Sequence, residues 1–319
     1  MGVCIVTTEC TRFENALVIR GGAIGDFILT LPVFQTLRQA APRANVEVLG
    51  YPRIASLAVS SGLALRAASI ESRGLEAFFV AGAELPDVWS RYFKQFDLIV
   101  SYLFDPHATF SKNVESVSGA RYVSGCYRPV DGVKRHASDQ LLDPLAVLGF
   151  EVTEHEPRLS VDAPDTNPGC DSPLLAVHPG SGSERKNWPI EAWGELLGRL
   201  LRANRSLGLA IFGGEADGER IDRLSSALPA ERVTVYFEQP LKEVAMHLAR
   251  CAFYIGHDSG ISHLAAAVGC RGIVLWGPTD PDTWRPRSRR FDIIIAEPDL
   301  RDLTVDDVHD AYVRGWGRI

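Results

Sequence analysis

Short apolar runs alternate along most of the chain with segments whose apolar residues recur every three or four positions. In the amino half the runs include residues 16–19 (ALVI) and 46–49. In the carboxyl half they include residues 174–178 (LLAVH) and 207–212. A short apolar run predicts a buried strand, and a repeat of three to four residues predicts a helix. The alternation of strand and helix in both halves predicts two doubly wound α/β domains.

The stretch from residue 252 to residue 281 contains the densest pattern. Residues 252–255 (AFYI) read as a strand, and residues 256–260 (GHDSG) are too polar and Gly-rich to continue it. A helical face follows and is ended by Gly269, before a second apolar run over residues 272–276. The loop before the helix should lie at the carboxyl end of a parallel strand, where free amides and the helix dipole attract anions. We therefore expect a phosphate or diphosphate there.

The amino half opens in a similar way, with residues 16–19 followed by a Gly-rich loop over residues 20–26 (RGGAIGD) and a helix that ends before Pro42. A lone loop of this kind fits a tight turn as well as a ligand site. It lacks the full G-x-G-x-x-G, and Gly50-Tyr51 stands where a dinucleotide-binding domain carries an acidic residue. The sequence thus disfavours a nicotinamide-dependent oxidoreductase.

A change in composition marks the predicted domain border. Residues 151–172 are acidic and contain three prolines, with little periodicity. We predict an amino-terminal domain over residues 1–160 and a carboxyl-terminal domain over residues 161–319. The last helix could pack back on the amino-terminal domain.

Composition narrows the class of protein. The 319 residues are 46% hydrophobic and 23% charged, which is typical of a globular chain. No apolar run approaches the roughly 20 residues of a membrane helix, and the first residues do not read as a secretion signal. The six cysteines form no C-x-x-C pair, so we expect reduced thiols and a cytoplasmic location. A net charge of −7 argues against a nucleic-acid partner.

Four segments resemble the signatures of glycosyltransferase family 9, the heptosyltransferase-like enzymes. They are ALVIRGGAIGDFILTLPVFQTLRQAAP (16–42), LLAVHPGSGSERKNWPIEAW (174–193), IFGGEADGER (211–220) and IGHDSGISHLAAAVGCRGIVLWGPTDP (255–281). The resemblance implies the GT-B fold, in which two Rossmann-like domains face an interdomain cleft. It further implies that the carboxyl-terminal domain binds the donor and the amino-terminal domain binds the acceptor.

The resemblance also implies an activity. A family 9 enzyme moves a sugar, typically a heptose, from a nucleotide-diphosphate sugar such as ADP-heptose, with inversion at the anomeric carbon. The acceptor would be a saccharide or glycolipid such as the lipopolysaccharide core, with peripheral contact at the cytoplasmic face of the inner membrane. No cofactor and no metal are implied, and the Asp280-Pro281-Asp282 spacing is not a metal site in this family.

By the resemblance, Asp26 is the catalytic carboxylate. A carboxylate at the start of a helix can accept a proton from an attacking hydroxyl. Asp is also a common helix cap, so Asp26 could serve the helix alone.

The resemblance places Lys186 against the donor diphosphate, where an ammonium group would offset the charge of the leaving group. The alternative is a solvated surface lysine. Ser181, Gly182 and Ser183 precede it and could bind phosphate oxygens. Gly213 and Gly214 could line the nucleoside side of the site, or form a tight turn.

Asp258, Ser259, Gly260 and His263 match the family pattern D-[ST]-G-x-x-H. Ser259 and the Gly260 amide would face the phosphates. Asp258 would be repelled by a diphosphate, so we expect it to hold sugar hydroxyls or to fix the loop through backbone bonds. His263 could bind the donor or be a buried structural residue, and we treat His178 and His257 as structural.

A basic stretch in the amino half, together with Gly25, is the candidate acceptor contact. Its residues are Arg121, Arg128, Lys134 and Arg135. An ordinary solvated loop would have the same composition.

Two features leave the substrates open. The acidic net charge fits poorly with a phosphorylated lipid acceptor at an anionic membrane, and the amino half shows no basic amphipathic helix. A glycosyltransferase with a different nucleotide sugar and a non-lipopolysaccharide acceptor is therefore the alternative. A non-catalytic nucleotide-sugar-binding protein is a more remote one.

Overall fold

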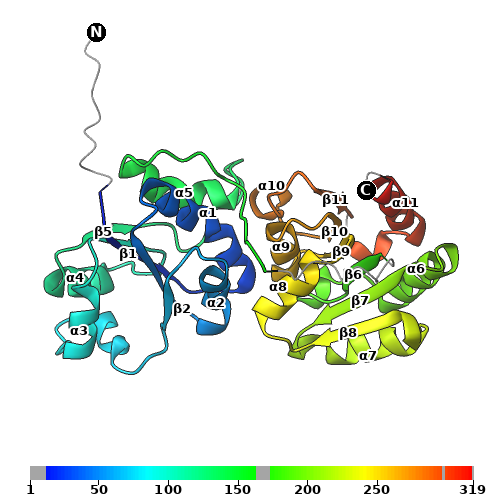
Figure 1. The fold of residues 1–319 in the computed structure, drawn as a ribbon, viewed down its shortest axis with the longest axis horizontal. Helices are drawn as coiled ribbons and strands as arrows, with labels where there is room; N and C mark the ends of the chain where they lie inside the picture. The colour runs from blue at the N-terminus through cyan, green and yellow to red at the C-terminus, as the bar shows by residue number, and fades with distance from the viewer. Residues whose placement is uncertain (1–11, 163–172, 297–298, 318–319) are drawn as a thin grey trace, which may run out of the picture. The chain divides into compact units, whose positions relative to one another are not determined.

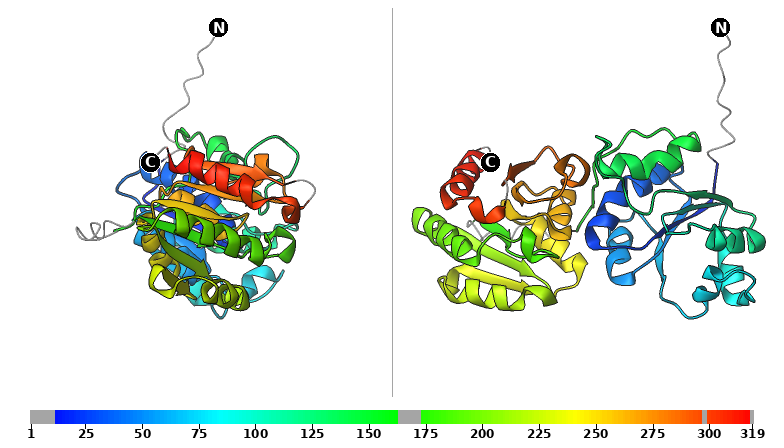
Figure 2. Two further views of the ribbon diagram at one scale, coloured as in Figure 1. Left: turned by 90° about the vertical axis from the view of Figure 1, so that its right-hand side faces the viewer. Right: turned by 180° about the vertical axis from the view of Figure 1, so that it is seen from behind.

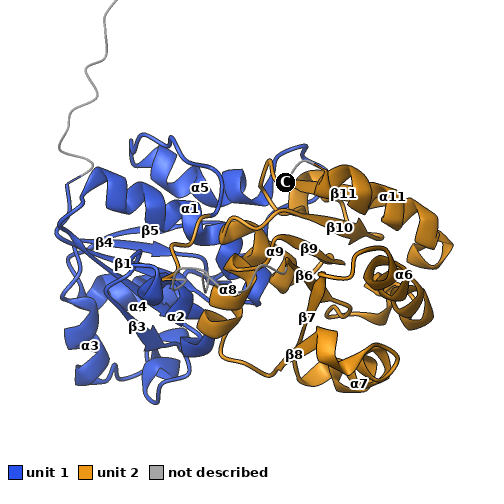
Figure 3. Ribbon diagram, turned by 45° about the vertical axis from the view of Figure 1, so that its right-hand side comes forward, with its two compact units in different colours: residues 1–157 blue, residues 158–319 orange. Residues whose placement is uncertain are grey.

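The computed structural model describes residues 12–162, 173–296 and 299–317. The chain divides into two compact units, residues 1–157 and residues 158–319 (Figure 3). The border predicted after residue 160 lies close to this division. Most of the Pro-rich segment used to predict it, residues 163–172, lies outside the described residues.

Unit 1, which runs from blue to green in Figure 1, is built on a five-stranded sheet. The strand order is β3-β2-β1-β4-β5, and every neighbouring pair is parallel. Its strands are β1 (Asn15–Arg20), β2 (Asn45–Gly50), β3 (Arg66–Ser69), β4 (Leu98–Ser101) and β5 (Arg121–Ser124). The chain order reverses between β1 and β4. All five carboxyl ends therefore lie at one edge of the sheet, with the reversal in the middle.

Helices connect these strands and cover the sheet. They are α1 (Ile24–Ala40), α2 (Pro52–Ser60), α3 (Asp87–Phe93), α4 (Thr109–Val117) and α5 (Ala137–Val147). Alternate residues of β1 face opposite ways, as a pleated strand requires. Leu17 and Ile19 join an aromatic core with Phe93 of α3 and Phe110 of α4. Helix α1 packs against α5.

Unit 2 contains a six-stranded parallel sheet in the order β11-β10-β9-β6-β7-β8. Its strands are β6 (Leu174–His178), β7 (Gly208–Gly213), β8 (Val233–Phe237), β9 (Phe253–His257), β10 (Gly272–Trp276) and β11 (Phe291–Ile295). Here the chain order reverses between β6 and β9. The two innermost strands of this unit are buried along nearly their whole length.

The helices of unit 2 are α6 (Ile190–Ala203), α7 (Gly218–Ser226), α8 (Leu241–Ala249), α9 (Gly260–Ala267), α10 (Pro281–Trp284) and α11 (Val305–Trp316) (Figure 2). The last helix, α11, packs against α6, and its Tyr312 ring meets Phe253 of β9 edge to face. Its buried residues Val308 and Ala311 belong to the core of unit 2. None of the described helices is long and apolar enough to cross a membrane.

The structure corrects one predicted boundary. Strand β9 continues through Gly256 and His257, which the sequence analysis judged too polar for a strand. Both residues are fully enclosed, and the His257 ring finds hydrogen-bond partners inside the unit. The strand predicted over residues 174–178 and the helix end at Gly269, which has a φ of 85°, are confirmed. Among the described cysteines, Cys126, Cys251 and Cys270 are free thiols, as expected.

Candidate functional site

The reversal of strand order between β6 and β9 creates the candidate site of unit 2. In open α/β sheets, ligands bind outside the carboxyl ends of the strands where the order reverses. The loop after β6 leads into a short 3-10 helix, η2 (Glu184–Lys186), and the turn after β9 leads directly into α9. Most of the predicted donor residues therefore come from two adjacent strand ends, whereas Gly213 and Gly214 lie at the end of the neighbouring strand β7.

The Asp258 carboxylate joins the loops that follow strands β6, β9 and β10. Lys186 Nζ donates to Asp258 Oδ2 at 2.5 Å, and Thr279 Oγ1 donates to the same oxygen at 2.6 Å. The Asp258 side chain is 10% exposed and the Lys186 side chain 27% exposed. We expected Asp258 to hold sugar hydroxyls or backbone groups, but in this structure it binds side chains. It fixes the Lys186 ammonium group beside the start of α9.

The start of α9 presents free backbone donors. Ser259 is its N-cap, and the Ser259 hydroxyl accepts from the Ser262 N–H. The N–H groups of Gly260 and Ile261 precede the first N–H that donates within the helix and have no partner among the described residues. With the helix dipole behind them, these amides can bind an anion.

A second set of polar contacts lies behind Ser259. His178 Nδ1 is 3.1 Å from Ser259 Oγ, and His178 Nε2 is 3.5 Å from Asp217 Oδ2. Burial alone would raise the pKa of Asp217, but hydrogen bonds from His178 and the Gly214 N–H outweigh it and lower that pKa. A Cβ at Gly180 would lie 1.7 Å from Asp217 Oδ1, so this position requires glycine.

His257 has a structural role, as the sequence analysis proposed. Its Nε2 accepts from the Trp188 N–H at 2.9 Å, so the proton of the neutral ring belongs on Nδ1, which faces the Gly180 carbonyl at 3.3 Å. Complete burial lowers the pKa of His257 to about 3. The ring is therefore neutral at physiological pH and ties the loop after β6 to β9.

The small residues before Lys186 form a tight turn. Ser181 Oγ donates to the Ser183 carbonyl at 2.8 Å and lies 3.2 Å from the Ser183 N–H. Gly182 and Ser183 are exposed. The turn leaves Ser183 Oγ and the loop backbone to meet a ligand, whereas Ser181 Oγ is engaged in the turn itself.

The other predicted donor residues are packed more tightly. A Cβ at Gly213 would lie 2.1 Å from Ile221 Cδ1, so this glycine allows close approach of α7 to β7. Gly214 is the N-cap of the 3-10 helix η3 (Glu215–Asp217), in agreement with the tight-turn alternative. His263 lies in the first turn of α9 and is buried.

In unit 1, Asp26 lies in the first turn of α1, after the carboxyl end of β1. Its Oδ2 accepts from the Ala23 N–H at 2.9 Å, which is a capping contact. Its Oδ1 is 3.5 Å from Arg20 Nη2, and the side chain is 32% exposed. The capping role is thus present, and the partly exposed carboxylate is also accessible to a hydroxyl from solution. The catalytic role stays a prediction.

Arg20, which the sequence did not predict as a site residue, forms an ion pair with Asp26. It is buried, and its guanidinium group lies 5.7 Å from the centre of the Tyr102 ring. Arg20 Nη1 donates to the Tyr127 carbonyl at 2.8 Å, which ties the loop after β5 to that of Asp26. Burial lowers the pKa of Arg20, although Asp26 acts in the opposite direction.

The predicted acceptor contacts separate into four groups. Arg128 and Lys134 are exposed on the segment between β5 and α5. Arg135 on the same segment is paired with Asp143 at 2.7 Å. Arg121 begins β5 and lies at the amino edge of the sheet, so the structure does not bring it together with Asp26. Gly25 lies beside Asp26 in the first turn of α1.

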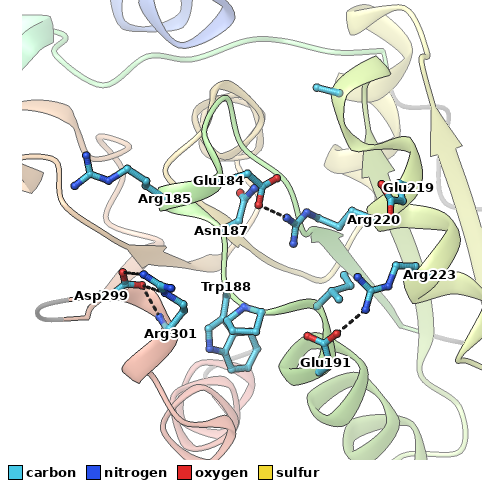
Figure 4. A pocket seen from close by; sticks show the side chains of 13 residues that line it. Glu184, Arg185, Asn187, Trp188, Glu191, Glu219, Arg220, Arg223, Asp299 and Arg301 are labelled. Carbon is cyan, nitrogen blue, oxygen red and sulfur yellow. Dashed lines mark hydrogen bonds and ion pairs between the residues drawn. The ribbon is translucent and has the colours of Figure 1, made fainter.

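Unit 2 also contains a cavity of about 590 Å³ between the starts of α6 and α7 (Figure 4). Six of the charged residues that line it form three ion pairs: Glu184 with Arg220, Glu191 with Arg223, and Asp299 with Arg301. Lys186 and Asp258 do not line it. We therefore place the candidate donor site at the strand ends and not in this cavity.

Three functional candidates were missed at the sequence level, namely Arg20, Asp217 and Thr279. All three lie inside the quoted signatures, Thr279 in the final GPTDP turn. Each acts through a contact between residues distant in sequence or between different loops. The described residues contain no group of three His, Cys, Asp or Glu side chains able to hold a metal ion. Asp280 instead caps α10.

Solved structures define the class to which this fold belongs. The structure of E. coli ADP-heptose lps heptosyltransferase II superposes with a TM-score of 0.76 at 18% identity, covering 95% of this chain and 99% of that one. The structure of E. coli heptosyltransferase WaaC with ADP-2-deoxy-2-fluoro heptose gives a TM-score of 0.73 at 21% identity, covering 94% of this chain and 99% of that one. The chain therefore has the two-domain, Rossmann-like GT-B fold of glycosyltransferases.

The sequence comparison identifies the family. The model of glycosyltransferase family 9 (heptosyltransferase) matches residues 135–310. Lipopolysaccharide heptosyltransferase 2 of Salmonella typhimurium is 26% identical over 310 residues, covering 87% of each chain. The chain belongs to glycosyltransferase family 9.

Proposed function

We propose that this glycosyltransferase moves a heptose from ADP-heptose to a saccharide or glycolipid acceptor of the lipopolysaccharide-core type, with inversion and without a metal ion. The relatives' names supply the substrates: ADP-heptose, its fluoro analogue, and lipopolysaccharide. The observation that carries the proposal is the ion pair of Lys186 with Asp258, which immediately precedes the start of α9 and its free amides at Gly260 and Ile261.

The donor diphosphate would bind at this point. An ammonium group has three donors, and Asp258 Oδ2 takes one of those of Lys186. The remaining donors and the two amides supply charge-assisted hydrogen bonds to phosphate oxygens. Asp217, which is held ionised beside Gly214, could accept from ribose hydroxyls.

Transfer then needs a proton acceptor and a stabilised leaving group. The acceptor hydroxyl gives its proton to the partly exposed Asp26 carboxylate as the hydroxyl oxygen attacks the anomeric carbon. The bond from that carbon to the diphosphate oxygen breaks, and the electron pair leaves with ADP. Attack on the face opposite the leaving group inverts the configuration. Lys186 and the α9 amides offset the charge that develops on the diphosphate. In metal-dependent enzymes a bound metal ion has this role.

The test is an acceptor-dependent assay. ADP release from ADP-heptose should require the saccharide acceptor, continue in excess chelator, and yield a single inverted anomer by NMR. Loss of activity with chelator, restored by a divalent ion, would contradict metal independence. A retained anomer would contradict the single-step mechanism.

The acidic net charge of −7 favours a second candidate, a glycosyltransferase that uses another nucleotide sugar and a non-lipopolysaccharide acceptor. A panel of ADP, UDP, GDP and CDP in a thermal-shift assay separates the two. A ligand at about 100 times its Kd stabilises the native state by about 2.7 kcal/mol. A larger shift with another nucleotide than with ADP would favour the second candidate. If no nucleotide shifts the melting temperature, both fail.

A further inference from the structure

A buried histidine beside the candidate donor site has no part in the mechanism proposed above. His178, the last residue of β6, is 4% exposed. Its two ring nitrogens contact residues of two other loops: Nδ1 is 3.1 Å from Ser259 Oγ, and Nε2 is 3.5 Å from Asp217 Oδ2. Ser259 is half-buried and caps α9, the helix whose first amides are open. We call these three residues the Asp217–His178–Ser259 relay.

The charge on Asp217 decides where the protons of the relay lie. Burial acts to raise the pKa of Asp217, but hydrogen bonds from His178 and the Gly214 N–H outweigh it and lower that pKa. The carboxylate is therefore ionised and accepts hydrogen bonds only. Nε2 of His178 must then carry a proton, and in the neutral ring Nδ1 carries none. It follows that the Ser259 hydroxyl donates to Nδ1.

The neighbouring hydroxyls do not change this assignment. Ser262 Oγ lies 3.4 Å from Ser259 Oγ, but it gives its own proton to the His257 carbonyl and accepts from the Tyr254 hydroxyl at 2.8 Å. The Ser262 N–H donates to Ser259 Oγ as part of the helix cap. While His178 is neutral, the Ser259 hydroxyl proton thus points inward. An anion at the start of α9 would meet only lone pairs of that oxygen.

A diphosphate at this position would favour a different proton arrangement, because a nearby negative charge favours the charged form of a histidine. We propose that donor binding brings a proton from solvent to Nδ1 of His178. The imidazolium ring then donates to Asp217 and to Ser259 Oγ at once, and the Ser259 hydroxyl turns to donate to a phosphate oxygen. His178 is thus a positioning residue for the donor. This role rests on the proposed function.

The other ionisable groups around the relay do not account for such a proton. Complete burial lowers the pKa of His257 to about 3, so its ring stays neutral, and burial raises the pKa of Tyr254, which stays protonated. His263 is buried in the first turn of α9 and has an interaction of its own. The nearby cations are in ion pairs, Arg220 with Glu184 and Lys186 with Asp258.

Titration calorimetry of ADP-heptose into the full chain, without an acceptor, measures the proton uptake. The diphosphate of a sugar nucleotide is esterified at both ends and has no group that titrates near neutral pH. In buffers of different ionisation enthalpy at pH 7.5, the binding enthalpy should reveal uptake of up to about one proton. Between pH 6.5 and 8.5 the affinity should fall as the pH rises, by up to about tenfold per pH unit.

His178→Gln removes the titrating ring and keeps a polar side chain at the end of β6. This variant should take up no proton, and its affinity for ADP-heptose should stay constant over the same pH range. Asp217→Asn removes the negative charge behind the ring and should take up fewer protons than the parent. The matched control is His257→Gln, the same change at a buried ring on the neighbouring strand, which should take up as many protons as the parent.

A cooperative melting transition would show that each variant folds. If His178→Gln does not fold, Asp217→Asn and the proton uptake of the parent decide. The proposal is overturned if the parent takes up no proton, or if His178→Gln takes up as much as the parent, because the proton then belongs to another group. Heptose transfer by an enzyme that takes up no proton would keep the proposed function and reject the role of His178.

The choice of nucleotide separates the two proposals further, because the relay responds to the diphosphate alone. Proton uptake with UDP-glucose, in a chain that does not bind ADP-heptose, would keep the role of His178 and reject ADP-heptose as the donor. If no sugar nucleotide binds, both proposals fail.

Discussion

Unit 1 and unit 2 each place a helix start at a reversal of strand order, but the two helix starts differ in charge. At α1, the Asp26 carboxylate accepts from the Ala23 N–H and adds negative charge. At α9, a neutral serine is the cap, the N–H groups of Gly260 and Ile261 stay open, and Lys186 lies close by. The same topology thus places a carboxylate at one helix start and open amides at the other, which suit the proposed roles of proton acceptor and anion site. The fold fixes the position, and the capping residues decide the chemistry.

The largest expected effect comes from replacing the carboxylate of unit 1. Asp26→Asn keeps the size and can still accept from the Ala23 N–H, since Asn and Asp cap about equally well. It cannot take up a proton. We expect turnover to fall by about 10²–10⁴-fold, the usual contribution of a general base, with ADP affinity and melting temperature unchanged.

Asp26→Ala serves as the companion variant. It should lose the same activity and also about 0.5–2 kcal/mol of stability, because the capping contact disappears. An Asp26→Asn enzyme with nearly full turnover would end the catalytic assignment and leave only the cap.

The corresponding change in unit 2 is Lys186→Ala. A charge-assisted hydrogen bond contributes about 1.5–3 kcal/mol, so ADP should bind roughly tenfold more weakly or worse, as measured by titration calorimetry. Adenosine, which has no phosphate, should bind as it does to the parent. Equal losses for ADP and adenosine would show that Lys186 touches no phosphate.

A third prediction concerns acid sensitivity, which should be located in unit 2. The pKa of His257 is about 3 in the folded chain and about 6.5 in an unfolded one, so the unfolded state binds more protons between these values. The stability from the neutral ring is complete above pH 6.5 and is lost as the pH falls towards 3. At pH 5.5 the loss is about 1.4 kcal/mol.

His257→Gln isolates this effect, because an amide can accept from the Trp188 N–H and donate to the Gly180 carbonyl without titrating. Its stability should fall less than the parent's between pH 7.5 and 5.5. Tryptophan fluorescence suits the measurement, since five of the six tryptophans lie in residues 158–319. Equal pH slopes for parent and variant would show that the ring is not buried in its neutral form.

The smallest expected effect belongs to Ser259→Ala. The variant loses the N-cap of α9 and should unfold with about 0.5–2 kcal/mol less stability. Because the open amides remain, its loss of ADP affinity should be smaller than that of Lys186→Ala. A loss as large as that of Lys186→Ala with unchanged stability would show that the hydroxyl binds phosphate directly.

The sequence was sufficient for the strands and for the order of the signatures, because buried parallel strands are short apolar runs between Gly-rich turns. The predicted end of strand β9 was wrong at His257. A polar ring can complete a buried strand when a distant residue such as Gly180 supplies its hydrogen-bond partner. It also missed the partner of Asp258. Lys186, Asp258 and Thr279 are far apart in the sequence and come together only in the folded chain, so no local sequence pattern predicts their contacts.

The predicted acceptor residues also show that a sequence pattern does not fix where side chains lie in the fold. Arg121 and Arg128 are neighbours in a basic stretch of sequence, yet β5 carries them towards opposite edges of its sheet. The basic pattern alone also could not separate Arg135, which Asp143 holds, from Lys134, which is exposed.

Hydrogen exchange on the full chain, with and without ADP, tests the division between the units most directly. The account predicts that ADP slows exchange in peptides covering residues 179–188 and 256–262, where Lys186 and the open amides of α9 lie, and leaves residues 20–27 unchanged. The Asp26→Asn variant should give the same map. Protection confined to residues 20–27, with none at the start of α9, would contradict it.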